Sequence, residues 1–380
     1  MSKCVTVYTQ AYNVENYIEQ CIKSVLSQTF QDFEWILVEN GSTDKTREII
    51  RKYAALDERI KPDYFDVNQD GFTNYYIAEK ADGRYIVKID SDDWIEPEYL
   101  EKLIAPFEDP DVDISICGAV NYEEETGRET PHEYGELDGV YSKSDIEKQF
   151  IEMRSYMGTY WGKMFRREIF CSILPDMKEI GEKLKKGDNF GGDVAFALCY
   201  LGECKKLAFV NERMYHYRIH NNSYATRTIG TNRVFSCLTL RETEHHFLHK
   251  VNAYTEQNVI MVDLLFWQNI EQLFKNIIRA DWDTDQKIKT ISEVCANKDL
   301  QLLRKEAYNS KVRTILMGDI AWCYMNAGNS KYLKNVLMLL EPDIFDSISN
   351  ETYEWMRENQ ILMSYIIMGE FDNAKRYMEE

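Results

Sequence analysis

Long hydrophobic runs are missing from this 380-residue chain. The most apolar stretch, residues 259–267, is far shorter than the roughly 20 residues of a membrane-spanning helix, and it contains Asp263. The nine cysteines are scattered, odd in number and never spaced as C-x-x-C. This pattern argues against a disulfide framework and a zinc site, so we expect reduced cysteines in a cytoplasmic protein. Because a strand pattern starts close to Met1, we also expect no signal peptide.

An excess of basic charge is also missing. The chain has 45 Lys and Arg against 64 Asp and Glu, a formal net charge of −19. This balance disfavours nucleic acid as a partner and disfavours broad binding to anionic lipid. A local basic patch would still allow peripheral association with the inner face of a membrane.

Apolar residues make up 44% of the chain, which supports a packed core and one large or two ordinary domains. In the first third, apolar strand patterns alternate with helical patterns. Strands are expected near 4–9, 33–39, 63–67 and 85–89, with helices near 14–26, around 49–53 and near 72–81. Short crossovers between apolar strands imply parallel pairing, so the fold class is α/β with a mostly parallel, Rossmann-like sheet.

The pattern changes near residue 230, where we place a domain boundary. We expect residues 1–230 to form the sheet domain, with a nucleotide-binding half at 1–110 and a second half at 111–230. Residues 231–380 show long amphipathic patterns and predict an all-α region. Two stretches there, 321–328 and 363–369, end at Gly and are similar to degenerate tetratricopeptide-type hairpins. Ordinary helical packing is the alternative, and these helices are candidates for homo-oligomer formation.

The run Asp90-Ser91-Asp92-Asp93 directly follows the apolar strand pattern at 85–89. In an open parallel sheet, ligands bind beyond the carboxyl ends of the strands. Asp90 and Asp92 are two residues apart, so they would point the same way in extended backbone. Two hard oxygen ligands suit Mg²⁺ or Mn²⁺ held against substrate phosphates. The alternative is an acidic surface turn.

Six blocks in the first 227 residues together resemble one family. They occur in order at 5–13, 24–44, 81–93, 161–170, 192–196 and 215–223. The chain is similar over this region to inverting glycosyltransferases of family 2. The resemblance implies a GT-A fold and transfer of sugar from a nucleotide-sugar, usually a UDP-sugar, to a hydroxyl of a glycan or glycoconjugate.

The resemblance also implies roles for the polar residues that follow the strands. Asp92 would be the main ligand of Mn²⁺ or Mg²⁺, and Asp90 would bind the metal or the ribose. Asp93 would orient the donor sugar. His220 would complete the metal shell, and Arg218 would neutralise the diphosphate.

Asp193 lies where the family carries its catalytic acidic residue, so the resemblance implies that it is the general base. The alternative is an N-cap of the following helix, and Asp188 is a second candidate for the base. Four residues would contact the nucleoside: Gln10, Tyr12, Glu39 and Asn40. Trp161 would either stack on an acceptor sugar or belong to the core.

Several positions depart from the family pattern. Gln10-Ala11 replaces Pro-Thr, Glu39-Asn40 replaces paired Asp, Gly192 replaces Glu, and 73–75 lacks an expected arginine. These departures leave a non-catalytic scaffold, acting through its helical tail, as the alternative function. A nucleotidyltransferase would need a Gly-rich, basic loop after the first strand, and Gln10, Ala11 and Tyr12 do not provide one.

Overall fold

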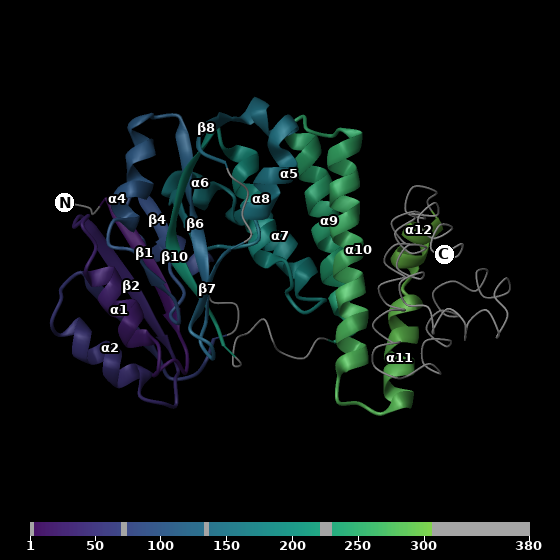
Figure 1. Cartoon of the computed structure of the whole chain (residues 1–380), viewed down its shortest axis with the longest axis horizontal. Helices are drawn as coiled ribbons and strands as arrows, with labels where there is room; N and C mark the ends of the chain where they lie inside the picture. The colour runs from purple at the N-terminus through teal and green to yellow at the C-terminus, as the bar shows by residue number, and fades with distance from the viewer. Residues whose placement is uncertain (1–3, 70–73, 133–136, 221–229, 306–380) are drawn as a thin grey trace, which may run out of the picture. The chain divides into compact units, whose positions relative to one another are not determined.

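The computed structural model describes residues 4–69, 74–132, 137–220 and 230–305 (Figure 1). Contacts divide these residues into two compact units that interleave along the chain. The first contains residues up to 180, with 192–226 and 246–258. The second contains 181–191, 227–245 and the chain from 259 onward. The two stretches with a tetratricopeptide-like pattern lie outside the described residues.

The first unit contains a ten-stranded sheet. Its main path runs β3-β2-β1-β4-β9-β6-β10-β5, with β7 beside β6 and β8 beside β10. The first four strands on this path are parallel, as the sequence predicts. The strands are β1 (Val5–Ala11), β2 (Phe33–Asn40), β3 (Ile60–Phe65), β4 (Tyr85–Lys88), β5 (Trp94–Ile95), β6 (Val112–Glu123), β7 (Arg128–Pro131), β8 (Gly139–Ser142), β9 (Lys163–Arg166) and β10 (Lys206–Ile219).

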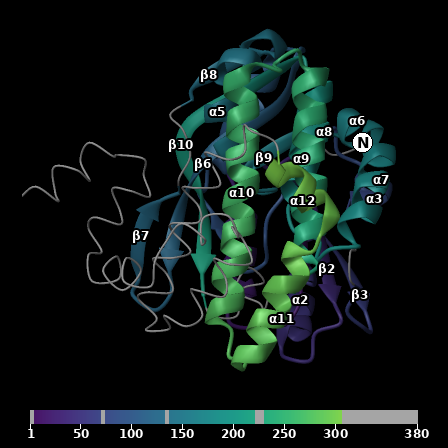
Figure 2. The ribbon, with the colours of Figure 1, turned by 90° about the vertical axis from the view of Figure 1, so that its right-hand side faces the viewer.

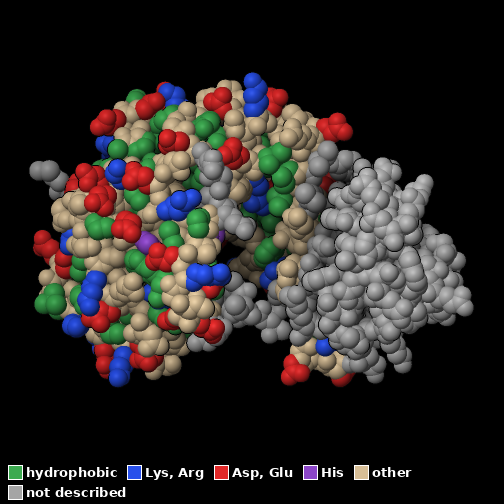
Figure 3. Space-filling model, viewed as in Figure 1, with side chains coloured by type: hydrophobic (Ala, Val, Ile, Leu, Met, Phe, Trp, Pro, Cys, Tyr) green, Lys and Arg blue, Asp and Glu red, His purple; other side chains and the backbone are tan. Residues whose placement is uncertain are grey.

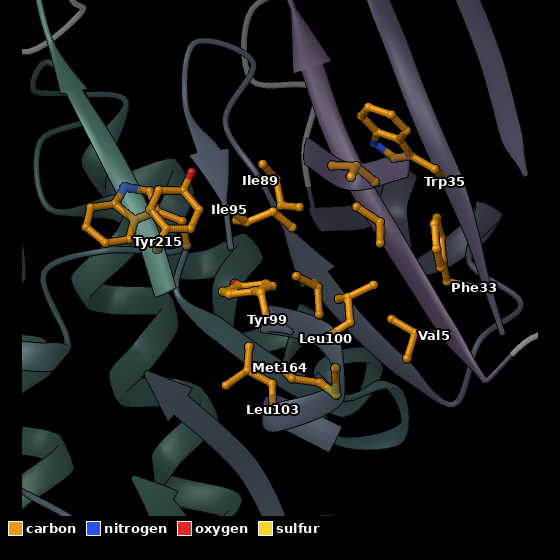
Figure 4. Close-up of a cluster of buried hydrophobic side chains, with 14 of the residues drawn as sticks. Val5, Phe33, Trp35, Ile89, Ile95, Tyr99, Leu100, Leu103, Met164 and Tyr215 are labelled. Atoms are coloured by element: carbon orange, nitrogen blue, oxygen red, sulfur yellow. The ribbon is translucent and has the colours of Figure 1, made fainter. Parts of the chain in front are cut away.

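The central parallel strands β1 and β2 are almost entirely buried. Every residue of β2 is buried, which is typical of a strand covered on both faces. In α1 (Ile18–Leu26), the buried positions Ile18, Cys21, Ile22 and Val25 follow the helical period, so one face packs on the core. Figure 4 shows part of this core, a single buried cluster that contains side chains of β1, β2 and α4 (Tyr99–Ile104) together with Tyr215 of β10.

The remaining helices of this unit connect the strands. They are α2 (Thr46–Ala54), α3 (Asn74–Lys80), α5 (Ile146–Tyr156), α6 (Arg167–Ser172), α7 (Leu174–Leu184) and α8 (Gly192–Glu203), with 3₁₀ turns η1 (Ala105–Glu108) and η2 (Lys143–Asp145). The last residues of α7 fall in the second unit. The face of the first unit visible in Figure 3 carries acidic and basic side chains interspersed.

The long strand β10 positions the candidate site. It pairs in parallel with β6 and in antiparallel with the short strand β5, where Tyr215 lies opposite Ile95 and His216 opposite Trp94. The acidic run at 90–93 immediately precedes β5. The pairing therefore brings residues 90–95 beside residues 215–220, although more than a hundred residues separate them in the chain.

The second unit is helical, as predicted for the chain beyond residue 230. Its described helices are α9 (Arg233–Lys250) up to His245, α10 (Glu256–Arg279) from Val259, α11 (Thr284–Cys295) and α12 (Lys298–Lys305). Figures 1 and 2 both show α9 and α10 side by side. The buried Asp263 of α10 binds Arg241 and His245 of α9, at 2.6 and 3.2 Å. Within the described part of the chain, no helix is long and apolar enough to cross a membrane.

Candidate active site

The acidic run forms a turn, not an extension of β4. The backbone N–H of Asp93 donates to the carbonyl of Asp90 at 3.2 Å. The expectation that Asp90 and Asp92 point the same way is therefore wrong, because side chains alternate regularly only in extended backbone. Asp90 pairs with Lys88 at 3.1 Å, whereas Asp92 lies 3.0 Å from Nε2 of His220.

Asp93 faces the interior of the protein. Its side chain is 1% exposed and accepts hydrogen bonds from the Tyr215 hydroxyl at 2.7 Å and the Arg218 backbone N–H at 2.8 Å. The Tyr215 oxygen in turn accepts from the Asp90 backbone N–H. Burial, and then the charges of Asp92 and Asp90, raise the pKa of Asp93 well above its usual range. These contacts give Asp93 a structural role, because they hold the turn against β10.

Arg218 is also held within the protein. Its guanidinium donates to the Asp92 backbone carbonyl at 2.8 Å and to the Gln20 side chain at 2.7 Å. The rings of three aromatic residues surround it, at 4.8 to 5.4 Å from ring centroid to guanidinium carbon: Tyr17, Trp94 and Tyr122. The side chain that the sequence assigns to the diphosphate is thus buried behind the turn that carries Asp92.

Asp92 and His220 place a carboxylate and an imidazole side by side. Burial and the charge of Asp90 raise the pKa of Asp92, and the hydrogen bond with His220 partly offsets them. Two neighbouring ligands in an octahedral shell, each about 2.1 Å from the ion, lie about 3.0 Å apart. Asp92 Oδ2 and His220 Nε2 are 3.0 Å apart and hydrogen-bonded, so a cation bound by both atoms would replace this hydrogen bond without moving either group far.

The described residues contain no group of three or more His, Cys, Asp and Glu side chains placed to hold a metal ion. A Mg²⁺-type site does not require one, because one or two protein ligands commonly act together with substrate phosphates and water. The Asp92 and His220 pair therefore fits a divalent cation that shares its shell with a phosphorylated substrate.

Asp193 is the second residue of α8. Its side chain is exposed, and within the described residues it has no hydrogen-bond or ion-pair partner. A carboxylate in the first turn also interacts favourably with the helix dipole. Partial desolvation raises the pKa of Asp193, and the positive charge of Lys88 acts against it.

Asp188, the second candidate for the base, is already paired. Its carboxylate binds the Arg233 guanidinium, and its backbone N–H donates to the Ser236 hydroxyl at 3.1 Å. Both partners belong to α9, so Asp188 fastens a segment of the helical unit to that helix. Of the two aspartates, only Asp193 has a carboxylate without a hydrogen-bond or ion-pair partner among the described residues.

The four residues assigned to the nucleoside separate into two kinds. Glu39 is fully buried and binds Arg47, and both ends of the Asn40 amide bond the segment at 68–69. By contrast, Tyr12 is 38% exposed and Gln10 is partly exposed. Glu39 and Asn40 therefore stabilise the loops around this edge of the sheet, and Tyr12 and Gln10 are the side chains that reach solvent.

Trp161 belongs to the core. It is 5% exposed and stacks on Tyr215, with ring centroids 4.5 Å apart, and on Tyr217. Sequence reasoning also missed one residue of the site, Lys88. Its signal was present, because a lysine interrupts an otherwise apolar strand two residues before the acidic run.

Comparisons with known proteins agree with this architecture. The sequence profile of Glycosyl transferase family 2 matches residues 6–174. EpsH of Bacillus subtilis is 30% identical over 305 residues, covering 78% of this chain and 84% of EpsH. Glycosyltransferase GlyA of Streptococcus pneumoniae is 29% identical over 227 residues, which cover 58% of this chain and 31% of GlyA.

A solved structure of S. aureus TarS 1–349 in complex with UDP has the same fold. It superposes with a TM-score of 0.58 at 18% identity, over 89% of this chain and 90% of that one. The parallel sheet, the acidic turn beside β10 and the similarity to these proteins lead to one conclusion. The chain is a GT-A glycosyltransferase that belongs to glycosyl transferase family 2.

Proposed function

We propose that this enzyme transfers a sugar from a UDP-sugar to a hydroxyl group of a glycan or glycoconjugate, with inversion at the anomeric carbon and with the help of Mn²⁺ or Mg²⁺. One observation carries the proposal. Asp92 of the acidic turn is paired with His220, whereas Asp193 at the start of α8 has no hydrogen-bond or ion-pair partner among the described residues. The two carboxylates are thus suited to different tasks.

Asp92 and His220 serve the leaving group in this proposal. A divalent cation bound there supplies Lewis-acid stabilisation of the diphosphate that departs. Asp90 contributes negative charge next to this pair, and Arg218 fixes the backbone of the turn through its bond to the Asp92 carbonyl. We assign Arg218 and Asp93 to positioning, because every contact of their side-chain polar groups given above is internal.

Asp193 serves the acceptor. Its carboxylate takes the proton from the acceptor hydroxyl while the new bond to the anomeric carbon forms and the bond to the diphosphate breaks. A positioned base of this kind contributes about 10²–10⁴-fold in rate. The raised pKa of Asp193 strengthens it as a base compared with an ordinary aspartate, provided that the group is still ionised at the working pH.

The nucleoside contacts Tyr12 and Gln10, which are the exposed members of the predicted set. Tyr12 offers a ring for stacking on a pyrimidine. Glu39 and Asn40 hold the surrounding loops through their internal bonds. UDP is the nucleotide bound by TarS, which shares the fold, and this supports uracil as the base. Peripheral membrane association, a cytoplasmic location and oligomer formation through the helical unit remain predictions.

The test is nucleotide release from a panel of nucleotide-sugars with Mn²⁺, with and without a chelator. We expect release from a UDP-sugar that stops on chelation and falls by at least about tenfold in Asp92→Asn. Asp111→Asn is a matched control, since Asp111 is a half-exposed carboxylate in a surface pair with Lys205. Full activity of Asp92→Asn, or activity that survives chelation, would overturn metal dependence. Absence of release with every donor would favour a non-catalytic scaffold.

A further inference from the structure

Lys88 places a positive charge among the carboxylates of the site. It is the last residue of β4, and its ammonium lies 3.1 Å from Asp90 Oδ1. Its side chain is 21% exposed. Asp90 takes one of three ammonium N–H groups, and the described residues provide no further hydrogen-bond partner. The ammonium therefore has donors left to face its surroundings.

Ring contacts connect Lys88 to the helix that carries Asp193. The ammonium lies over the ring of Tyr160, 5.1 Å from its centroid. Tyr160 stacks on Phe196 of α8, with centroids 4.4 Å apart. Phe196 follows Asp193 by three residues, so the two share a face of the helix. Tyr160 thus contacts both the end of β4 and helix α8.

Two other cations of the described structure that lie close to these groups already have internal partners. Arg218 is enclosed by aromatic rings and bonded to the turn. Lys163 is 2% exposed, and its ammonium donates to the Thr159 carbonyl, the Thr159 hydroxyl and the Trp161 carbonyl. Burial lowers the pKa of Lys163 to about 7, so much of its charge is lost near neutral pH.

Lys88 differs from Lys163 in this respect. Burial acts to lower its pKa, but the charges of Asp90 and Asp193 outweigh burial and leave the pKa above its usual range. Lys88 therefore stays cationic throughout the range in which the enzyme would work.

We propose that Lys88 is a positioning residue of the transfer reaction, whose charge holds Asp90 beside β4 and keeps the Asp193 base ionised. This inference rests on the proposed role of Asp193. Asp90 is thereby held in the contact with Lys88 while Asp92 pairs with His220, so the two carboxylates of the turn do not compete for one position. The positive charge of Lys88 also opposes the rise in the pKa of Asp193 that desolvation causes.

The groups that face Asp193 define what the experiment must separate. They are Lys88 of β4, Asp90 after β4, Lys163 of β9 and Tyr160 before β9. Lys88 itself is faced by Asp90, Asp193, Tyr160 and by Tyr8, its neighbour in β1. Only substitution of Lys88 removes a permanent positive charge from this set without removing a carboxylate.

The test compares Lys88→Met, Lys88→Gln and Lys88→Arg. We expect the acid limb of kcat/KM to move up by about one pH unit in the Met and Gln variants, which is about a tenfold loss at a fixed pH on that limb. Lys88→Arg keeps the charge and should lie close to wild type. Lys102→Met is the matched control, because Lys102 forms an exposed ion pair with Glu212 elsewhere in the unit.

A second readout needs no turnover. Infrared difference spectra between each protein and its Asp193→Asn counterpart report the titration of this carboxylate, in the wild-type and in the Lys88→Met background. We expect the pKa of Asp193 to rise in the Lys88→Met background by the same amount as the acid limb of kcat/KM. An unchanged titration in both neutral variants, or an equal shift in Lys88→Arg, would overturn the inference. An inactive wild type with the expected infrared shift would reject the proposed function and retain the charge coupling.

Discussion

Replacing Asp193 with Asn tests the assignment of the base directly. The substitution keeps the size of the side chain but removes its ability to take a proton. We expect kcat to fall by about 10²–10⁴-fold, which corresponds to about 2.7–5.5 kcal/mol of lost transition-state stabilisation.

We expect the same substitution to change the stability of the protein only slightly. The Asp193 carboxylate is exposed and has no hydrogen-bond partner among the described residues, so Asn leaves no buried group unsatisfied. The remaining cost is the favourable charge at the start of α8, about 0.3–1 kcal/mol. That change corresponds to at most a few degrees in Tm for a domain of about 200 residues. The activity loss would therefore exceed the stability loss severalfold.

The pH dependence has a definite sign. Because desolvation raises the pKa of Asp193, the base loses its charge as pH falls through a value above that of an ordinary aspartate. Activity of the wild type should decline on the acid side in that window. Asp193→Asn should lack this limb, because Asn does not titrate. Steady-state nucleotide release is measured across pH, at saturating donor for kcat and at limiting donor for kcat/KM.

Asp188→Asn is the matched control, since it makes the same change five positions earlier in a residue that binds Arg233. It should lower Tm and leave kcat within a few-fold of wild type. The reasoning is refuted if Asp193→Asn keeps kcat within a few-fold, or if Asp188→Asn removes the acid limb at unchanged Tm.

Three further predictions concern stability and the loops of the site. Asp93→Ala removes the acceptor of two buried donors, so the free energy of unfolding should fall by about 2–5 kcal/mol, measured by denaturant titration. Asp263→Asn should cost about 3–5 kcal/mol, because it leaves Arg241 partly buried without its partner. Burial acts to raise the pKa of Asp263, but the hydrogen bonds from His245 and Arg241 outweigh burial and lower it. The stabilisation that Asp263 provides is therefore present above its unfolded-state pKa and is lost as the pH falls through its folded-state pKa. Thermal melts across pH would detect this loss. Gly41→Ala should raise the donor KM and lower Tm, since φ is +78° and the new Cβ would meet the Val67 carbonyl carbon at 2.5 Å.

Local sequence was sufficient for most of the sheet domain. Apolar runs and their periodicity located the parallel strands and the helices between them, and the order of the motifs identified the family. The prediction that Asp193 is the base has the same origin, because Asp193 lies at the position where the family carries its acidic residue. These features depend on residues close together in the chain, so their patterns are visible without tertiary contacts.

Other features of the site depend on partners that lie far away in the chain. The prediction that the side chains of Asp90 and Asp92 point the same way was wrong, because the chain turns at 90–93. Glu39 was expected at the nucleoside, but Arg47 of the following helix holds it inside. In the same way, Arg218 was expected at the diphosphate, and aromatic residues from other parts of the chain enclose it. No local pattern reports which partner a charged side chain will meet.

The sequence by itself therefore determined the fold class, the family and the presence of several carboxylates at one edge of the sheet. Only the tertiary structure decided how those carboxylates differ. Asp93 is buried against Tyr215, Asp92 pairs with His220 and Asp90 pairs with Lys88, whereas Asp193 pairs with no group in the described part of the chain. The physical reason is that desolvation and the nearest opposite charge set the role of an ionisable group, and strands far apart in the chain supply both.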